Sequence, residues 1–503
     1  MKDNKNKLAV IAALVSVCML AAGCSSSADS VDTVKSTGEV ISSQAQESDT
    51  DDASSESSAS DTSSKTARES QTINIETKET EKSDPSSSTD STAPEKTDSK
   101  KTTDTASGST STESKTVTPY TATSGTKLDT SDIFSNRDLT QNADTSEAKT
   151  VTVSDGQTID ITEEGIYILT GSASNCTVKV NVDSEAKVQL VLDNVSITNS
   201  DFPAIYVVSA DKCFITTASG SVNALSVTGT FKADGDTNTD AVIFSKDDLV
   251  LNGLGTLNID SAAGNGISGK DDLKITGGTY NINAYLHGIE ANDSVRICDG
   301  SFTIKSSTKD GIHCENSDDD TLGWVVISGG SFDITAKSDG VQATTVLQID
   351  GGTINISAAE GMEGTYIQIN DGTINIKATD DGINAARKST SETVCFEMKG
   401  GNVTVSMGSG DVDAIDANGN VIVSGGTINI TCPTQGTAES FDYDGTATYN
   451  GGTIIVNGET LSDIPTPMMM GGGRGGMGGM GGMEGNFPQD GGFGGRGNRG
   501  GRM

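Results

Sequence analysis

The chain has 503 residues, of which 33% are hydrophobic and 4% aromatic, and its formal net charge is −36. This acidity argues against nucleic acid or an anionic lipid surface as a partner, because both carry the same sign of charge. It is compatible with cation binding. The scarcity of aromatic rings, with Trp324 the single tryptophan, argues against a sugar site built from stacking platforms.

Residues 1–24 have the pattern of a bacterial secretion signal. Three lysines precede a short apolar core that runs from Leu8 to Leu20. A run of small residues then ends at Cys24 and resembles a lipoprotein box, with Ala21 where Leu is preferred. We expect Cys24 to carry the lipid and the protein to be extracellular, anchored to the cell membrane as a lipoprotein. An ordinary secretion signal is the alternative.

Residues 25–145 are rich in Ser, Thr, Asp, Lys and Glu and nearly free of large apolar side chains. Such a segment cannot bury enough apolar surface to offset the entropy of ordering it, so we predict a disordered linker. Residues 466–503 are rich in Gly, Met and Arg, and we predict a second disordered segment there. Residues 146–465 remain as the predicted folded domain.

A degenerate repeat of roughly twenty to thirty residues runs from about Asp248 to Val456, and each copy ends in a phrase such as GGTINI. In the copy from Asp339 to Ala358, apolar residues alternate with polar ones in three short runs, separated by turns that include Gly351 and Gly352. Period-two alternation without a helical period predicts short half-buried strands. The fold class is therefore all-β. We predict a parallel β-helix, a solenoid in which each coil consists of short strands separated by turns.

Stacked coils bring equivalent positions of the repeat into rows. Tyr280, Phe302 and Phe332 fall at one inward position, which favours an internal aromatic stack over a sugar-binding strip. Asparagines fall at one outward position, where ladders of amide hydrogen bonds stabilise a stack. These are Asn281, Asn355, Asn375 and Asn429.

Two further columns of polar residues come from a phrase of the type Asp-Gly-Ile-Glu in successive coils. The first column contains Asp310, Asp339, Glu360, Asp381 and Asp413. The second column contains Glu290, His313, Gln342, Glu363, Asn384, Asp416 and Asp442.

Carboxylates on rungs about 4.8 Å apart repel one another unless a cation lies between them. Carboxylate and amide oxygens are the ligands that Ca²⁺ prefers, whereas zinc and copper favour nitrogen and sulfur. We therefore predict calcium as the cofactor. The alternative is that each Asp-Gly is turn chemistry, with the Asp capping its own turn. The predicted calcium ligands are Glu290, Asp310, Asp339, Gln342, Glu360, Glu363, Asp381, Asn384, Asp413 and Asp416.

Cysteines give no sign of a metal site. Those beyond the signal are scattered and contain no CxxC pair, which argues against zinc bound by thiolates, and buried unpaired thiols are favoured over disulfides. They are Cys176, Cys213, Cys298, Cys314, Cys395 and Cys432.

The GGTINI and Asp-Gly-Ile phrases, together with the lipoprotein signal, the Ser/Thr linker and the Gly-Met tail, resemble a family of bacterial surface proteins. These are carbohydrate-binding proteins of the pectate-lyase-like, right-handed parallel β-helix type. The resemblance covers about residues 148–460 and implies calcium between coils and binding of acidic polysaccharide, such as polygalacturonate, or cellulose-like polysaccharide. It implies adhesion rather than cleavage, in a monomer. The pattern departs from acidic residues at His287, His313, Ala414 and Ser440.

We predict no catalytic residues, and two other functions stay open. A calcium-dependent polysaccharide lyase would share the fold and would need a basic residue to remove the proton next to the uronate carboxylate. A structural or adhesive surface protein would need no glycan ligand. The candidate bases for the lyase are Arg296, Lys309, Lys337 and Arg387.

Overall fold

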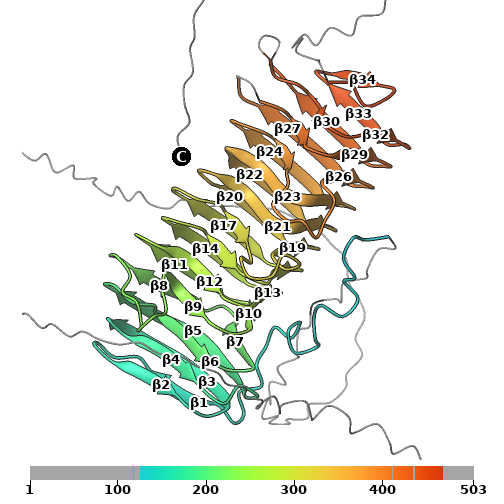
Figure 1. Cartoon of the computed structure of the whole chain (residues 1–503). Coiled ribbons are helices and arrows are strands. Elements are labelled where there is room, and N and C mark those ends of the chain that lie inside the picture. The colour runs from blue at the N-terminus through green and yellow to red at the C-terminus, as the bar shows by residue number, and fades with distance from the viewer. Residues whose placement is uncertain (1–116, 118–124, 410–411, 434–436, 468–503) are drawn as a thin grey trace, which may run out of the picture. The chain divides into compact units, whose positions relative to one another are not determined.

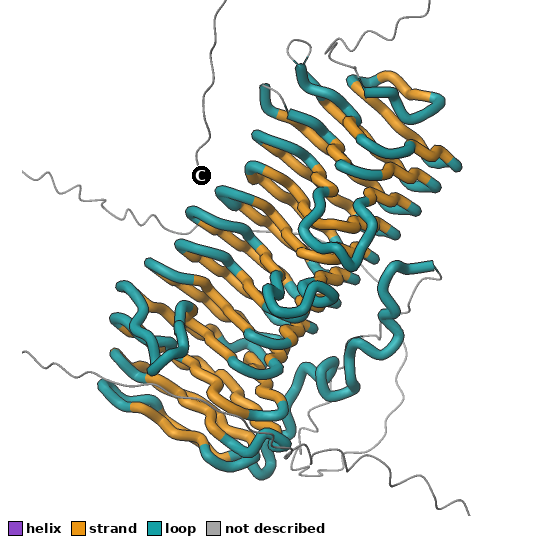
Figure 2. The backbone as a smooth tube through the Cα atoms, in the orientation of Figure 1, coloured by secondary structure: helices purple, strands orange, loops and turns teal. Residues whose placement is uncertain are grey.

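The computed structural model describes residue 117 and residues 125–409, 412–433 and 437–467. These residues form strands and loops without a helix, which confirms the all-β prediction for this part of the chain. Figure 2 shows short strands that follow one another around each coil and are joined by loops. Within the described ranges, no helix has the length and hydrophobicity of a membrane span. The predicted signal, Cys24 and the tail beyond residue 467 lie outside the described residues.

The strands pair in three parallel stacks, here called stacks A, B and C. β3 and β5 contribute to both A and B, and β21 and β23 contribute to both A and C. Stack A contains β1 (Lys149–Thr152), β3 (Gly165–Ser174), β5 (Lys187–Asn199), β7 (Lys212–Thr217), β10 (Leu249–Gly253), β13 (Asp272–Ile275), β16 (Ser294–Ile297), β19 (Trp324–Ile327), β21 (Asp339–Ile349), β23 (Glu360–Ile369), β26 (Cys395–Met398), β29 (Asn420–Val423) and β32 (Ala447–Tyr449).

Stack B continues from β3 and β5 through the strands that carry the GGTINI phrases. They are β8 (Val222–Val227), β11 (Thr256–Ser261), β14 (Thr279–Ala284), β17 (Ser301–Ser306), β20 (Ser331–Thr335), β22 (Thr353–Ala358), β24 (Thr373–Ala378), β27 (Asn402–Met407), β30 (Thr427–Thr431), β33 (Thr453–Val456) and β34 (Glu459–Leu461). β34 pairs antiparallel with β33.

Stack C carries the Asp-Gly-Ile phrases. Besides β21 and β23 it contains β2 (Thr158–Ile161), β4 (Thr177–Asn181), β6 (Ile205–Ser209), β9 (Ala241–Ser245), β12 (Asn265–Gly269), β15 (Ile289–Ala291), β18 (Ile312–Cys314), β25 (Ile383–Ala385), β28 (Ile415–Ala417) and β31 (Asp442–Tyr443). Figure 1 shows the coils following each other in chain order, which is consistent with the predicted solenoid.

Inward rows of the repeat form the core. Ile354 lies opposite Ile374 and Ile356 opposite Ile376, and all four side chains are buried, whereas Thr353 and Thr373 face outward. β-Branched side chains fit the pleated inner surface of stacked strands. The alternation in the sequence thus sets which face of each strand lies in the core.

Glycines in the repeat have two different physical roles. Gly352 has a φ of +95°, a turn conformation that residues with a Cβ rarely adopt. Gly340, in the Asp-Gly-Val phrase, is required by packing instead. A Cβ on Gly340 would lie 2.6 Å from the carbonyl oxygen of Gly361 in the next coil. The phrase therefore keeps its glycine where two coils approach most closely.

The predicted aromatic stack is internal. Tyr280 and Phe302 have ring centroids 5.2 Å apart, and Phe302 and Phe332 have theirs 4.5 Å apart. All three side chains are buried, so they cannot stack on a sugar. The asparagine row is interrupted: Asn375 donates to Asn355 at 3.0 Å, but Asn281 pairs in register with Thr303.

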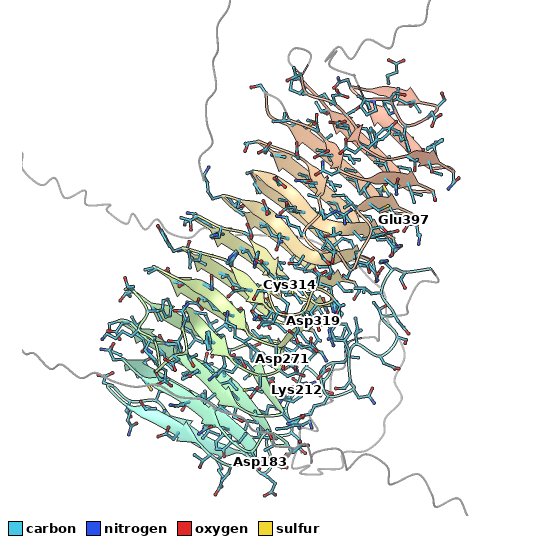
Figure 3. All side chains as sticks on the ribbon, viewed as in Figure 1. Asp183, Lys212, Asp271, Cys314, Asp319 and Glu397 are labelled. Atoms are coloured by element: carbon cyan, nitrogen blue, oxygen red, sulfur yellow. The ribbon has the colours of Figure 1, made fainter. Side chains whose placement is uncertain are left out.

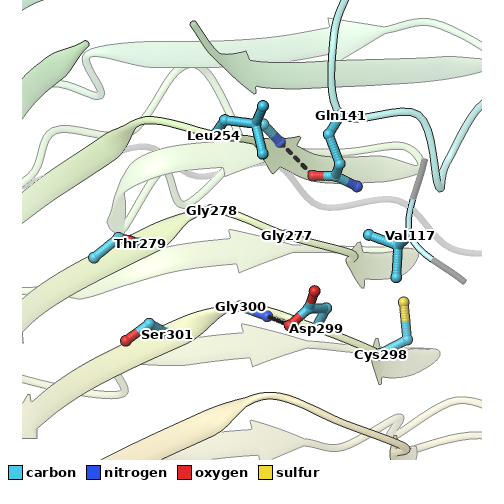
Figure 4. A pocket seen from close by; sticks show the side chains of 11 residues that line it. Val117, Gln141, Leu254, Gly277, Gly278, Thr279, Cys298, Asp299, Gly300 and Ser301 are labelled. Carbon is cyan, nitrogen blue, oxygen red and sulfur yellow. Dashed lines mark hydrogen bonds between the residues drawn. The ribbon is translucent and has the colours of Figure 1, made fainter. Parts of the chain in front are cut away.

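The predicted linker boundary at residue 145 needs correction. Residues 125–145 lie against the outer face of stack A, as the cyan segment of Figure 1 shows. The backbone nitrogens of Lys127 and Leu128 donate to Gln368 at 2.7 Å and to Gln348 at 2.9 Å. Further along, Gln141 donates to the carbonyl oxygen of Thr276 at 3.0 Å. Figure 4 shows Gln141 beside Leu254, with Val117 and Cys298 lining the same pocket.

The amino-acid composition did not predict this contact, because hydrogen bonds and ion pairs, rather than apolar burial, hold the segment against stack A. Asp138 is fully buried; its carboxylate lies 3.9 Å from the Lys212 ammonium and 3.7 Å from that of Lys274. Ile133 and Leu139 are the buried apolar residues that accompany it. The rows of outward polar side chains that receive the segment exist only once the coils are stacked.

The six cysteines are free thiols in the described residues, which confirms the prediction of unpaired cysteines there. Five are buried and Cys432 is partly exposed. Burial raises the pKa of the Cys213 thiol to about 12, and that of Cys395 to about 11. Such thiols are poor thiolate ligands and poor nucleophiles at neutral pH.

We predict that Asp138→Asn destabilises the protein by about 3 kcal/mol, because it leaves the buried Lys274 without its carboxylate. Denaturant unfolding of the whole chain measures the effect. Asp132→Asn, at an exposed position of the same segment, is the matched control and is expected to change stability by less than about 0.5 kcal/mol. Equal stabilities of the two variants would contradict the docking of residues 125–145.

Candidate metal site on two polar columns

The two polar columns run along stack C in the predicted register. In the second column Glu290 lies opposite His313, His313 opposite Gln342, and Gln342 opposite Glu363. The column continues from Glu363 through Asn384 and Asp416 to Asp442. In the first column Asp339 lies opposite Glu360. Stacking therefore brings all of the predicted ligands into two adjacent rows.

Side chains of the first column also serve the backbone. The backbone nitrogen of Asp339 donates to Asp310 Oδ1 at 3.0 Å, and that of Asp413 donates to Asp381 Oδ1 at 2.8 Å. These two carboxylates therefore accept from the backbone of the next coil, which differs from the alternative in which each Asp caps its own turn. The other oxygen of Asp310 lies beside His313 of the second column.

The centre of the columns gathers three carboxylates. Asp339, Glu360 and Glu363 have oxygens that all lie within 4.8 Å of one another, and all three residues are buried or partly buried. Burial, with the charges of Asp310, Glu360 and Glu363, raises the pKa of Asp339 to about 8. Burial, with the charge of Glu363, raises the pKa of Glu360 to about 7. Without a cation, this group retains protons near neutral pH.

Carboxyl groups further along the columns also have raised pKa values. Burial is the main cause that raises the pKa of Asp413 to about 6, with the charges of Asp381 and Asp442 adding to it. Burial and the same two neighbours raise the pKa of Asp416 to about 7. A cation among these carboxylates would displace the protons that they otherwise hold.

Two amide oxygens among the carboxylates lack a hydrogen-bond donor. They are Gln342 Oε1 and Asn384 Oδ1, both buried in the described structure. Each lies opposite Glu363, one coil before it and one coil after it. A buried oxygen without a donor costs about 1–3 kcal/mol, and a metal ion would remove that cost. The donor set is oxygen only, which fits the predicted calcium.

Two predicted ligands lie in different surroundings at the other end of the columns. Glu290 Oε2 accepts hydrogen bonds from Asn265 at 2.8 Å and Ser268 at 2.7 Å, and lies 3.4 Å from the Lys270 ammonium. Asp310 Oδ2 lies 2.7 Å from His313 Nδ1. Burial would raise the pKa of Asp310, but hydrogen bonds from His287 and His313 outweigh it and hold that pKa well below its usual range.

A cavity of about 390 Å³ opens beside the columns, along the part of them from Glu290 to Glu363. Its lining includes Lys388, which sequence reasoning missed, and whose ammonium lies 2.7 Å from Glu363. The lining residues are His287, Glu290, Lys309, Asp310, His313, Glu315, Ser338, Asp339, Gln342, Thr344, Glu363 and Lys388.

Lys388 is placed by contacts between two loops. Its backbone nitrogen donates to Thr365 Oγ1 at 3.0 Å, and the nitrogen of Thr390 donates to Asp320 Oδ2 at 2.9 Å. Figure 3 labels Cys314 at the end of β18 and Asp319 in the loop that supplies Asp320. The only signal in the sequence was a basic residue four positions after Asn384, and such residues are common on any surface.

The candidate lyase bases are dispersed. Lys309 lines the cavity, whereas Lys337 and Arg387 do not. Arg296 lies 2.5 Å from the Asp272 carboxylate and over the ring of Trp324, on stack A. Of the four candidates, Lys309 is therefore the one that lines this cavity in the described residues.

A family model and a related protein match the chain under the same description. A family model described as "Carbohydrate-binding domain-containing protein" matches residues 155–366 and 360–462. A protein with the same description from Acetivibrio thermocellus is 31% identical over 201 residues, which are 40% of this chain and 70% of that protein. A solved structure, that of the polysaccharide lyase-like protein from C. thermocellum as a gadolinium derivative, has 30% identity and a TM-score of 0.40. It covers 45% of this chain and 96% of its own.

We predict that the metal-free protein loses stability as pH rises from 5 to 8. Asp339, Glu360 and Asp416 have folded-state pKa values of about 8, 7 and 7, above those of unfolded carboxyl groups. The folded state therefore binds more protons than the unfolded state in this window, so deprotonation costs folded-state stability, roughly 2–5 kcal/mol in total. Asp310, with its lowered pKa, acts only below about pH 4, where its stabilisation is lost as pH falls.

Chemical denaturation in the presence of chelator at several pH values measures this slope. Asp339→Asn is expected to flatten it, whereas Asp160→Asn, at an exposed position of β2, is expected to leave it unchanged. A metal-free protein whose stability is constant or increases between pH 5 and 8 would contradict the prediction.

Proposed function

Because the chain belongs to the family of carbohydrate-binding domain-containing proteins, we propose that it binds an acidic polysaccharide through calcium held by the two polar columns. One observation carries the proposal most directly. The buried, donor-free oxygens Gln342 Oε1 and Asn384 Oδ1 lie on either side of Glu363, among carboxylates with raised pKa values. Oxygens of this kind, in this density, favour a hard divalent cation.

The residues that would hold calcium are those of the centre and the C-terminal end of the columns. They are Asp339, Gln342, Glu360, Glu363, Asp381, Asn384, Asp413 and Asp416. Bound calcium would supply positive charge on an otherwise acidic face, and could share its coordination with a uronate carboxylate. Bare columns would repel an acidic polymer, because the protein and the polymer then carry charges of the same sign.

A cellulose-like polymer is the other ligand within the same function. A neutral chain has no carboxylate to share with the calcium, and in this alternative it would bind by hydrogen bonds to outward polar side chains. The outward rows of stack B, with Asn355 and Asn375 on its surface, provide such groups. The two ligand classes therefore differ in whether a chelator abolishes binding.

We also propose that the three parallel stacks form a right-handed parallel β-helix. All ladder pairs between β1 and β33 in the described structure are parallel. Connections between parallel strands of one sheet are almost always right-handed, because of the twist of the strands. A crystal structure with left-handed coils would overturn this part of the proposal.

The placement at the cell surface is part of the proposal. Cys24 would carry a lipid and residues beyond it would connect the anchor to the coils, as a monomer outside the membrane. A polysaccharide-binding domain needs this exposure to reach its ligand. Mass spectrometry of the protein extracted from membranes tests the placement, and an unmodified Cys24 would exclude it.

A lyase is the second candidate function, and the position of Lys309 in the cavity favours it. An enzyme of this class needs a basic residue near the cation that binds the uronate. Lys388 is a poorer base: burial lowers its pKa, but the bond to Glu363 outweighs this and raises it above the usual range. A protonated lysine would serve better to pair with a carboxylate of the polymer.

Affinity electrophoresis of the protein without residues 1–24, through polygalacturonate, a soluble cellulose derivative and a neutral control, tests the function. We expect retardation by polygalacturonate that a chelator abolishes. Glu363→Gln and Asp381→Ala are expected to weaken it about tenfold or more, since each removes one charged ligand. Asp160→Asn, exposed and distant from the columns, is the matched control.

The other outcomes separate the alternatives. Retardation only by the cellulose derivative, with or without chelator, would replace calcium bridging by hydrogen bonding. Unsaturated products that absorb in the ultraviolet would indicate a lyase. Free migration through every polymer would exclude glycan binding and leave a structural or adhesive protein.

A further inference from the structure

The chain contains two histidines, and both lie at one point of the polar columns. His287 and His313 come from successive coils and stack with ring centroids 4.1 Å apart and planes inclined by 26°. Both Nδ1 atoms face the same oxygen, Asp310 Oδ2, at 3.3 Å and 2.7 Å. The three side chains are largely buried, with exposed fractions of 10%, 14% and 6%.

We propose that His287, His313 and Asp310 bind one divalent transition-metal ion, for which Zn²⁺ is the best fit. The site is separate from the eight residues proposed above to hold calcium, and it takes Asp310, which the sequence predicted as a calcium ligand. Each of the three residues offers one ligand atom to a group whose members lie within 4.8 Å of one another. We take the ligand atoms as Nδ1 of each histidine and Oδ2 of Asp310, because both Nδ1 atoms lie beside that oxygen. Three protein ligands leave a fourth position, and these residues line the cavity. The site does not depend on glycan binding.

The distances are close to those of a tetrahedral site. With metal–ligand bonds of about 2.0 Å, two ligand atoms lie about 3.3 Å apart. The separation of His287 Nδ1 from Asp310 Oδ2 is 3.3 Å. That of His313 Nδ1 is 2.7 Å, a hydrogen-bond length, and a small ring rotation would open it. Asp310 Oδ1 is already fixed by the backbone nitrogen of Asp339 at 3.0 Å, so the carboxylate is held in place.

Glu315 supplies the outer contact that metal-bound histidines need. Its Oε2 atom lies 3.3 Å from His313 Nε2, on the side of the ring opposite to Asp310. A proton on Nε2, donated to Glu315, leaves the lone pair on Nδ1 for a metal. Carboxylate–histidine–metal arrangements of this kind fix the ring orientation and raise the basicity of the ligand.

Hydrogen bonding alone satisfies the group less well. Both Nδ1 atoms lie beside the one oxygen Asp310 Oδ2, and His287 Nδ1 also accepts from the backbone nitrogen of Asp310 at 3.4 Å. A metal ion between the two rings and the carboxylate would be shared by all three ligand atoms.

The donor types separate this ion from calcium. Imidazole nitrogen is a borderline ligand that favours zinc, copper and nickel over calcium, which binds oxygen. The carboxylates at the centre of the columns offer no nitrogen among Asp339, Glu360 and Glu363. The two columns would therefore bind two classes of metal ion. The boundary between the zinc site and the calcium site would lie between the coil of His313 and the coil of Gln342.

Zinc analysis of the full chain without an affinity tag tests the proposal. Protein stripped with chelator is dialysed against Zn²⁺ with excess Ca²⁺, and bound metal is counted. We expect one Zn²⁺ per chain, lost in His287→Gln and in His313→Gln. Glu315→Gln is expected to lower zinc affinity about tenfold through its outer contact. Glu363→Gln, which changes an oxygen ligand of the proposed calcium site, is the matched control and is expected to retain the zinc.

Replacement of Zn²⁺ by Co²⁺ gives a second readout that does not depend on the variants. We expect the intense visible absorption of four-coordinate cobalt in the wild type, abolished by competing zinc. Circular dichroism without metal checks that each variant folds. Failure of the wild type to hold zinc, or equal zinc in the wild type and both histidine variants, would overturn the proposal; the second result would place the zinc elsewhere in the chain.

Discussion

The approach of successive coils is the constraint on which the rest of the structure depends. Backbone nitrogens of one coil donate to carbonyl oxygens of its neighbour, as Gly311 does to Asp339 at 2.9 Å. There is no space for a larger residue at that point, since a Cβ on Gly311 would lie 2.7 Å from the carbonyl oxygen of Gly340. Each side chain therefore lies directly over its counterpart, and any residue type that recurs in the repeat becomes a continuous row.

Rows of apolar residues gain from this arrangement, but rows of carboxylates do not. Different groups compensate the repulsion between carboxylates at different points along the columns. At one end Lys270 and the two histidines oppose Glu290 and Asp310, and in the middle Lys388 opposes Glu363. At Asp413 and Asp416 burial raises the pKa values to about 6 and about 7, so each carboxyl group retains its proton below that pH. The proposed calcium and zinc ions replace protons and hydrogen bonds where oxygens or nitrogens lack better partners.

Stacking also creates an outer polar face on stack A, and the chain uses it to hold residues 125–145. Gln348 and Gln368 lie in register on that face and receive successive backbone nitrogens of the segment. Lys127 adds a contact over the ring of Tyr366. Neither the segment nor the face would be ordered by apolar burial alone, so the boundary of the folded domain depends on hydrogen bonds between parts of the chain more than two hundred residues apart.

The sequence by itself determined the local pattern: strand alternation, the turn at Gly352, the inward aromatic row and the membership of the two polar columns. The sequence predicts these features because side chains alternate between the two faces of a strand. The repeat then places the same positions of each coil in the core. Only the tertiary structure decided which residues from other parts of the chain contact the columns and the outer face of stack A. Lys388 and Glu315 reach the columns from loops of irregular length, His287 and His313 join Asp310 only through the offset between two coils, and residues 125–145 contact strands far along the chain. The periodicity of the sequence does not predict such contacts, because they depend on how loops of irregular length fold in space. These contacts distinguish the group of oxygen ligands at the centre of the columns from the group that contains histidine nitrogens.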